Sequence, residues 1–339
     1  MAITLKKFSF LSSAALALML AACGGDDTDS ANESTDKGST DGDTKIEETY
    51  VIGVTQFVEH PSLDAAYEGF QKALEDAGLE VEYKYNTANG DSSQTVTIAQ
   101  TLVGEGVDLI FANSTPSAQA AKSATNDIPI VFTSVTDAVG AELIASMETP
   151  GGNVTGTVDL HPDTITNTVA FLKDELGAKK VGTVYNTGEQ NSIAQVEQIK
   201  EALEAEGIEL EEAAVSTSAE VKQATESLLG KVDSLYIFTD NTVVTALEAV
   251  IDVANANQLP VAVGEMDSVA RGGLAAYGFE YYDIGYEAGQ KAVEILADGK
   301  SAGEIPATYP ANLKLVINKA TAENLGLDIK DTWNAEVIE

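Results

Sequence analysis

The sequence predicts an α/β fold made of two consecutive units, each a parallel sheet flanked by helices. From Tyr50 onward, short apolar segments alternate with amphipathic segments of helical period, and this alternation is typical of parallel sheets covered by helices. The alternation begins again after Pro150-Gly151-Gly152, and similar strands open the two units, Val51-Ile52-Gly53-Val54 and Val181-Gly182-Thr183-Val184. With 339 residues, the chain is long enough for two domains of ordinary size.

The first unit has the clearer pattern, because Leu63, Phe70 and Leu74 fall on one face of a helix that Gly78 ends. In chain order, we expect strands at 50–55, 81–85, 109–112 and 130–132, with helices at 63–77, 92–104 and 117–125 between them. Every helix then connects two neighbouring strands, as a parallel sheet requires.

The second unit repeats this order, and three further segments follow it. In chain order, we expect helices at 164–176, 192–206, 220–229 and 242–257, and strands at 180–185, 210–215, 235–238 and 261–263. After Gly272-Gly273 we expect a strand at 274–279, a helix at 284–296 and a strand at 313–318. These late segments either cross back to the first unit or add edge strands to the second, and the pattern leaves both arrangements open.

The residues before Tyr50 are of two kinds. Lys6 and Lys7 precede a short apolar run that ends in Leu20-Ala21-Ala22-Cys23, an order typical of a secretory signal and too short for a transmembrane helix. Its end resembles the bacterial lipobox, in which cleavage precedes a cysteine that receives lipid. We therefore expect a signal peptide over 1–22 and a lipid anchor on Cys23, the alternative being an ordinary signal with a chance cysteine. Residues 23–49, rich in Gly, Ser, Thr and Asp, are expected to form a disordered acidic tether.

Composition excludes several classes of function. The chain has 19 basic and 54 acidic residues, a formal charge of −35, and such a surface repels nucleic acid. The acidic balance does not identify a cationic ligand, because it also keeps a protein soluble. Cys23 is the only cysteine and is expected to carry lipid, so disulfides and cysteine catalysis are not expected. With only His60 and His161 available, we expect no multi-histidine metal site, and we expect no cofactor.

Polar segments follow five of the expected strands, where ligands of open α/β sheets bind. They are 113–117, 133–137, 186–192, 239–242 and 264–265. Hydroxyls and free N–H groups at helix starts suit a carboxylate, and Asp240, Glu265 or Asp137 would suit an ammonium group. Helix capping alone is enough to explain any one of these segments. Five such segments at the facing edges of two units favour a binding cleft. His60 lies in the loop after the first strand and is a further candidate contact.

The sequence contains no phosphate loop, no G-x-S-x-G elbow and no H-E-x-x-H motif. No Ser/His/Asp set can be assembled either, so we expect no catalytic residues and no enzyme.

A lipoprotein signal, an acidic tether and two α/β units together resemble the substrate-binding proteins of bacterial ABC importers, in particular the family that includes tryptophan- and tyrosine-binding proteins. The resemblance runs from about residue 50 to residue 330. Its marks are Ile52-Gly53-Val54-Thr55-Gln56, Glu59-His60-Pro61-Ser62-Leu63-Asp64, Gly69-Phe70, Tyr185-Asn186, Glu189 with Asn191-Ser192, Gly264-Glu265 and Gly285-Tyr286-Glu287-Ala288-Gly289.

The resemblance implies a two-lobed, type I periplasmic-binding-protein fold (a Venus flytrap) with three hinge crossovers. Lobe 1 would be 50–157 with a return segment at about 276–308, and lobe 2 would be 158–275 with a C-terminal segment at about 309–339. It implies a monomer, anchored by lipid on the extracytoplasmic face of the cell membrane. Such a monomer would deliver a small ligand, most often an aromatic amino acid, to an ABC permease and its cytoplasmic ATPase.

The expected ligand-binding residues are Gln56, Ser114, Thr115, Ser134, Thr136, Asn191, Ser192, Asp240, Asn241 and Glu265. Phe57, Tyr185 and Tyr281 are candidates for an aromatic floor. Thr187 stands where many relatives have proline, which leaves the ligand more open. The alternatives are a receptor for a nucleoside, a sugar or another amino acid, a sensor for a membrane signalling partner, and an extracellular enzyme on the same scaffold.

Overall fold

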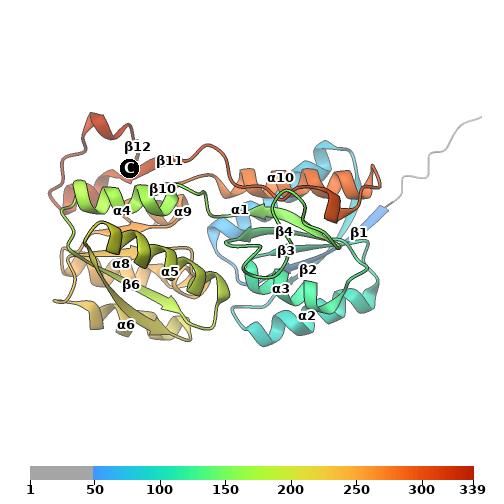
Figure 1. The fold of residues 1–339 in the computed structure, drawn as a ribbon, viewed down its shortest axis with the longest axis horizontal. Coiled ribbons are helices and arrows are strands. Elements are labelled where there is room, and N and C mark those ends of the chain that lie inside the picture. The colour runs from blue at the N-terminus through green and yellow to red at the C-terminus, as the bar shows by residue number, and fades with distance from the viewer. Residues whose placement is uncertain (1–48) are drawn as a thin grey trace, which may run out of the picture. The chain divides into compact units, whose positions relative to one another are not determined.

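Two sheets, each covered by helices on both faces, organise residues 49–339, which are the residues that the computed structural model describes (Figure 1). The expected signal peptide, Cys23 and nearly all of the expected tether lie outside these residues. None of the helices between residues 49 and 339 is both long and apolar enough to cross a membrane.

The first sheet contains five parallel strands in the order β2-β1-β3-β4-β5. In chain order its strands are β1 (Thr49–Gln56), β2 (Glu80–Thr87), β3 (Leu109–Asn113), β4 (Ile130–Val135) and β5 (Val154–Val158). Helices α2 (Ser92–Glu105) and α3 (Thr115–Ala124) cover one face, and α1 (Pro61–Asp76) and α10 (Tyr281–Leu296) cover the other (Figure 1). We call this sheet with its four helices the first lobe.

The second sheet contains seven strands in the order β12-β11-β10-β9-β8-β6-β7. Its strands are β6 (Lys180–Asn186), β7 (Glu209–Val215), β8 (Ser234–Ile237), β9 (Val261–Val263), β10 (Ala275–Gly278), β11 (Lys314–Asn318) and β12 (Glu336–Ile338). Its helices are α4 (Thr164–Asp174), α5 (Gln190–Ala205), α6 (Val221–Leu228), α7 (Asn241–Thr245), α8 (Leu247–Ala256), α9 (Met266–Ala270) and α11 (Lys319–Asn324). All neighbouring strands run parallel except β10 and β11. This is the second lobe.

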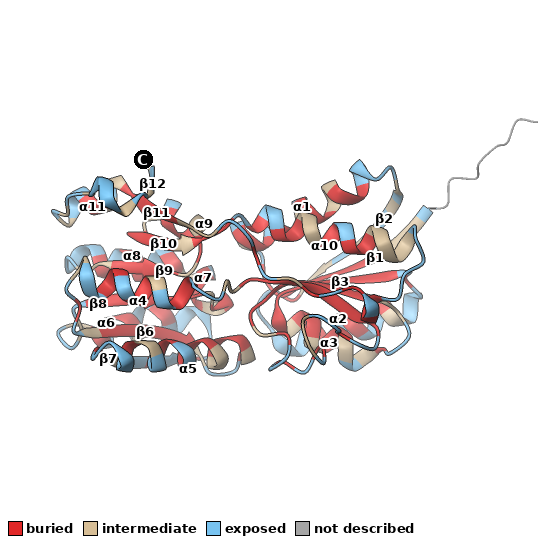
Figure 2. Cartoon of the chain, turned by 45° about the horizontal axis from the view of Figure 1, so that its top comes forward, coloured by how far each residue is buried: buried red, intermediate tan, exposed pale blue. Residues whose placement is uncertain are grey.

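Apolar side chains are buried on both faces of each sheet, so the central strands are buried almost throughout, whereas the edge strands β2, β7 and β12 and the outer faces of the helices are partly exposed (Figure 2). Ile52 and Val54 of β1 pack against Phe70 of α1 and Ala288 of α10. In the second lobe, one cluster joins α4 and α5 to the sheet and another joins α6 and α8 to its opposite face. Each lobe therefore has two apolar layers around its sheet.

The chain passes three times between the lobes within residues 49–339, at 159–163, 279–280 and 309–313. The late segments divide between the two arrangements that the sequence left open. Helix α10 returns to the first lobe, whereas β10 and β11 join the second sheet. This topology puts residues 159 and 281 at neighbouring crossings, where they meet.

Helices α1 and α10 cross unusually closely because glycines lie at the contact. A Cβ atom on Gly285 would lie 1.9 Å from the carbonyl oxygen of Ala66, and one on Gly69 would lie 2.1 Å from that of Tyr282. Only glycine permits such an approach of two backbones. The crossing fixes where α1 and α10 begin, and both ends lie at the candidate site.

The structure also differs from the expected elements in places. Strands β5 and β12 were not expected. The expected helix at 242–257 is divided at Ala246 into α7 and α8, and α10 begins at Tyr281 instead of residue 284.

Candidate functional site

A cavity lies between the two lobes, and three buried carboxyl groups line it, those of Asp159, Asp240 and Glu265. Its free volume is about 10 Å³, roughly the space of one water molecule, so the lining side chains or the lobes must move to admit a larger ligand. The residues that line it are His60, Leu63, Ser134, Thr136, Asp159, Asn191, Thr239, Asp240, Asn241, Val244, Glu265 and Tyr281. They come from strand ends and helix starts of both lobes and from the first crossing, which contains Asp159.

The wall formed by the first lobe is made of hydroxyls and a neutral ring. His60 caps α1, its Nδ1 accepting from the backbone N–H of Leu63 at 3.5 Å. Burial, and then the charge of Arg271, lowers the pKa of His60 to about 3, so the ring is neutral at pH 7. Ser134, near the end of β4, has φ 55°, a conformation that costs energy outside glycine. Among the described residues its buried Oγ has no hydrogen-bond partner.

The start of α3 adjoins this wall. Ser114, the N-cap of α3, has φ 90°, and its hydroxyl donates across the cleft to Asn241 Oδ1 at 3.2 Å. The hydroxyls of Thr115 and Ser117 in the first turn of α3 are buried, and within residues 49–339 neither has a partner. This helix start therefore combines free N–H groups with unused hydroxyls, a combination that favours an anion.

Asp240 lies on the second lobe and is fully buried. Its Oδ1 accepts from the N–H of Val243 at 2.8 Å, which caps α7, and its Oδ2 accepts from the N–H of Asn186 and the hydroxyl of Ser192, both at 2.6 Å. Burial, with a smaller contribution from the charge of Glu189, raises the pKa of Asp240 to about 7. Its hydrogen bonds to fixed donors identify it as a structural cap as well as part of the wall.

Glu265 and Asp159 are the other two carboxyl groups of the cavity. Glu265, which follows β9, contacts the hydroxyls of Ser62 and Ser268, and burial raises its pKa to about 8. Asp159, in the first crossing, accepts from Tyr281 Oη at 2.9 Å and from Thr136 Oγ1 at 3.1 Å. Burial raises the pKa of Asp159 to about 6.

The described residues that line the cavity include no lysine and no arginine. Arg271, which acts on His60 and Glu265 at longer range, makes two 2.8 Å bonds to Glu248 outside the cavity. Burying a carboxylate without a partner costs several kcal/mol. The three carboxyl groups therefore suit a ligand that brings its own positive charge.

Hydrogen bonds across the cleft hold the lobes together around the cavity. Ser62 of α1 donates to Asp267 Oδ2 at 2.8 Å and contacts Glu265. Gln195 of α5 donates to Thr136 Oγ1 of the first lobe at 3.2 Å. Within its own lobe it also donates to Thr239 Oγ1 at 2.7 Å. With the bond between Ser114 and Asn241, these contacts describe a closed arrangement of the lobes.

Six of the ten expected site residues line this cavity: Ser134, Thr136, Asn191, Asp240, Asn241 and Glu265. The other four lie beside it or behind it. Ser114 and Ser192 adjoin the cavity because they bond to the lining residues Asn241 and Asp240, and Thr115 is the next residue after Ser114. Gln56 braces the loop after β1, donating to Val58 O at 3.0 Å and to Asp64 at 2.7 Å.

Of the aromatic candidates, Tyr281 lines the cavity, whereas Phe57 and Tyr185 are core residues of their lobes. His60 lines it, and Asp137 lies in a separate outer pocket. The residues that we did not choose are Leu63, Asp159, Thr239 and Val244. Thr239 belongs to one of the polar strand-end segments, but Asp159 follows a strand that was not expected.

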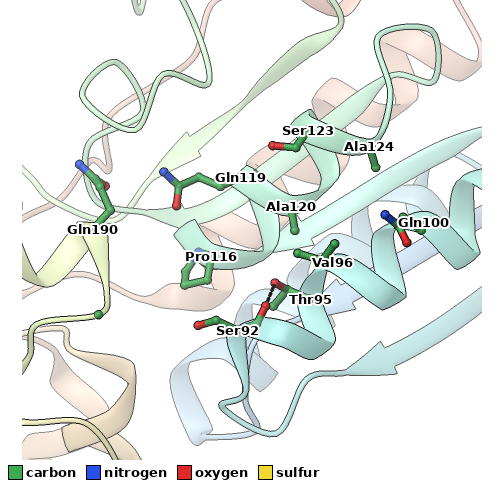
Figure 3. A pocket seen from close by; sticks show the side chains of 11 residues that line it. Ser92, Thr95, Val96, Gln100, Pro116, Gln119, Ala120, Ser123, Ala124 and Gln190 are labelled. Carbon is green, nitrogen blue, oxygen red and sulfur yellow. Dashed lines mark hydrogen bonds between the residues drawn. The ribbon is translucent and has the colours of Figure 1, made fainter.

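A larger pocket of about 310 Å³ lies between α2, α3 and the start of α5 (Figure 3). The described side chains around it, among them Ser92, Val96, Gln119 and Gln190, include no charged group. It offers no partner for a charged ligand. Within residues 49–339, no cluster of three or more His, Cys, Asp or Glu side chains is arranged to hold a metal ion.

Comparison with known proteins agrees with this architecture. The sequence model of a family described as ABC transporter substrate binding protein matches residues 51–337. A tyrosine-binding protein of Clostridioides difficile (strain R20291) is 43% identical over 326 residues, which are 95% of this chain and 92% of the relative.

Two solved structures are also similar. An ABC domain from Streptococcus pneumonia in complex with L-Trp is 34% identical with a TM-score of 0.80, covering 85% of this chain and 100% of the other. The ligand-free, open structure of a substrate binding protein with adhesive properties from Clostridium difficile is 39% identical with a TM-score of 0.65, covering 86% and 99%.

Proposed function

The chain belongs to the family of ABC transporter substrate-binding proteins, which bind solutes and are not enzymes, and we propose that it captures one aromatic amino acid between its lobes. The observation that carries this proposal is the set of three buried carboxyl groups with no basic side chain among the described residues of the cavity. A sugar or a nucleoside brings no positive charge to these groups, whereas an ammonium group would allow Glu265 and Asp159 to ionise although burial raises the pKa of each.

The ammonium group of the ligand is assigned to Glu265 and Asp159. Both accept only from side-chain hydroxyls, which can rotate, so each keeps lone pairs for a further donor. Asp240 instead accepts from two backbone N–H groups and a hydroxyl at fixed positions. Its role is to hold the start of α7 and to add negative charge nearby.

The carboxylate of the ligand is assigned to the first lobe. Ser134 Oγ, Thr115 Oγ1 and Ser117 Oγ are buried hydroxyls that have no partner within residues 49–339. They lie at a strand end and in the first turn of α3, where the helix dipole stabilises an anion. A buried hydroxyl left without a partner costs free energy, and a carboxylate would supply the missing acceptor.

The aromatic ring is assigned to the apolar part of the wall, formed by Leu63, Val244 and Tyr281 with the neutral ring of His60. Two relatives support an aromatic ligand, because one is named for tyrosine and another is solved with L-Trp. The higher TM-score against the L-Trp complex than against the open, ligand-free relative supports a closed state for this structure.

The remaining parts of the proposal concern cellular context. We propose a monomer anchored through lipid on Cys23 to the extracytoplasmic face of the cell membrane, with a disordered tether up to about residue 49. There it would deliver its ligand to an ABC permease with a cytoplasmic ATPase. The membership of the family supports this placement, and the sequence before Tyr50 supports the anchor.

The test is a thermal-shift and calorimetric screen of the protein without residues 1–23. L-Tyrosine, L-tryptophan and L-phenylalanine are compared with their analogues that lack the amino or the carboxyl group, and with nucleosides and sugars. A ligand at 100 times its Kd stabilises the folded state by about 2.7 kcal/mol, which raises Tm by about 5–10 °C. We expect this rise only with an intact aromatic amino acid.

Glu265→Gln should weaken the affinity by about 10- to 100-fold, because a hydrogen bond to a charged group is worth about 1.5–3 kcal/mol. Glu226→Gln, at an exposed position of α6, is the matched control and should bind as the unaltered protein does. Stabilisation by sugars or nucleosides alone, or an unchanged affinity in Glu265→Gln, would contradict the proposal.

A further inference from the structure

A carboxylate that does not line the cavity lies directly behind its second-lobe wall. Glu189, between β6 and α5, is 1% exposed. It accepts from Asn241 Nδ2 at 2.6 Å, from Thr242 Oγ1 at 2.7 Å and from Asn191 Nδ2 at 3.3 Å, and also from the backbone N–H groups of Asn241 and Thr242. Glu189 thus joins the starts of α5 and α7.

These contacts fix which way two asparagine side chains face. A carboxylate only accepts hydrogen bonds, so each amide must turn its NH2 group toward Glu189. The Oδ1 atom of Asn241 then points the other way and accepts from Ser114 across the cleft at 3.2 Å. The Oδ1 atom of Asn191 is buried and has no partner in the described part of the chain, and Asn191 lines the cavity.

The second-lobe wall consequently presents acceptors. Its polar members are Asn191, Asn241, Asp240, Glu265 and Thr239, and the hydroxyl of Thr239 is already engaged with Gln195 Oε1 at 3.0 Å. Asn191 Oδ1 and the carboxyl oxygens of Glu265 can still accept from a ligand, whereas Asn241 Oδ1 and the oxygens of Asp240 already accept hydrogen bonds from the protein. A ligand group that carries several N–H donors fits such a wall, whereas a carboxylate or a carbonyl is repelled.

We propose that Glu189 is a positioning residue that sets the ligand preference of the site, because it orients Asn191 and Asn241 so that the second lobe accepts a primary ammonium group. This inference rests on the function proposed above and deepens it. With glutamine at position 189, the side chain could both donate and accept, so either asparagine could rotate its amide by 180°. The wall would then mix donors with acceptors and would discriminate less.

The test compares Glu189→Gln with Glu197→Gln, the same substitution at an exposed position of α5, the helix that begins after Glu189. The probes are L-tyrosine and 3-(4-hydroxyphenyl)propanoate, which differ only in the amino group, and the readout is the ratio of their affinities. We expect this ratio to fall at least tenfold in Glu189→Gln, mainly through weaker binding of L-tyrosine, and to stay unchanged in Glu197→Gln. An unaltered ratio in Glu189→Gln would overturn the inference.

A second readout needs no ligand and separates this inference from the proposed function. The side-chain NH2 resonances of Asn191 and Asn241 should shift in Glu189→Gln, and the pKa of Asp240 should fall because a neighbouring negative charge is removed. If the unaltered protein binds none of L-tyrosine, L-tryptophan and L-phenylalanine, the proposed function fails, while unshifted resonances would refute the role of Glu189. If Glu189→Gln does not fold, Asn191→Ala replaces it, since loss of one oriented oxygen should lower the ratio by a smaller amount and no change would refute the role.

Discussion

Replacement of Gly285 by alanine tests the close crossing of α1 and α10, which positions both Ser62 and Tyr281 at the site. The new Cβ would lie 1.9 Å from the carbonyl oxygen of Ala66, whereas ordinary contact begins at 3.4 Å, so the helices must separate by up to 1.5 Å. Overpacking of this kind costs about 3 kcal/mol at the upper end, and alanine recovers about 1 kcal/mol of helix propensity. We expect a net loss of about 2 kcal/mol.

The assay is urea unfolding of the ligand-free protein, with equal m-values as the sign that only stability has changed. Gly104→Ala in α2 is the matched control, because a Cβ there meets no atom within 4 Å. It should be neutral or up to about 1 kcal/mol more stable, and Gly285→Ala should unfold about 4–8 °C earlier on heating. If Gly285→Ala were as stable as the unaltered protein, the close crossing would be refuted.

Two further predictions concern the carboxyl groups and the closure of the lobes. The pKa of Glu265 is about 8 in the folded protein against 4.5 normally, so between these values the folded state keeps a proton that the unfolded state has lost, and stability should fall as the pH rises toward 8 and level off above it. Tm measured between pH 7 and 9, where His60 no longer titrates in either state, should decline, and Glu265→Gln should flatten the decline; a flat profile in the unaltered protein would contradict this. Ser62→Ala removes the hydroxyl that links α1 to Glu265 and Asp267. Without ligand, X-ray scattering should then show a larger radius of gyration for Ser62→Ala than for the unaltered protein. An unchanged radius would argue against a role of Ser62 in closing the lobes.

Most of the fold could be predicted because each strand and helix has its own periodic pattern. Strand β5 could not, since Val154-Thr155-Gly156-Thr157-Val158 contains only two strongly apolar residues, although all five are buried. The pattern of α10 alone could not place it, because an amphipathic helix specifies that one face is covered but not which sheet covers it; its return to the first lobe was expected only from the family resemblance. The split of the helix at Ala246 has no breaking residue to indicate it.

The site could be predicted where it depends on strand ends. Ser134, Thr136 and Asp240 follow strands that the sequence shows clearly, and their polar character is unusual for buried positions. Asp159 was missed together with β5. Leu63 and Val244 were missed because an apolar residue on a helix has the same pattern whether it faces the core or a cavity. Gln56 was expected at the site because it ends β1. Its side chain instead donates hydrogen bonds to Val58 O and Asp64, which follow β1 in the chain.

The place of α10 in the first lobe also determines the order in which the protein can fold during synthesis. The five strands of the first sheet are complete at Val158, yet Ala288 and Ala292, which complete the apolar layer over Ile52 and Val54, belong to a helix that begins at Tyr281 and ends at Leu296. The nascent chain must therefore extend through the first ten strands before its N-terminal lobe can close its core. A ribosome-bound chain that stops short of Leu296 would consequently lack a finished first lobe, although all five strands of that lobe had already been made.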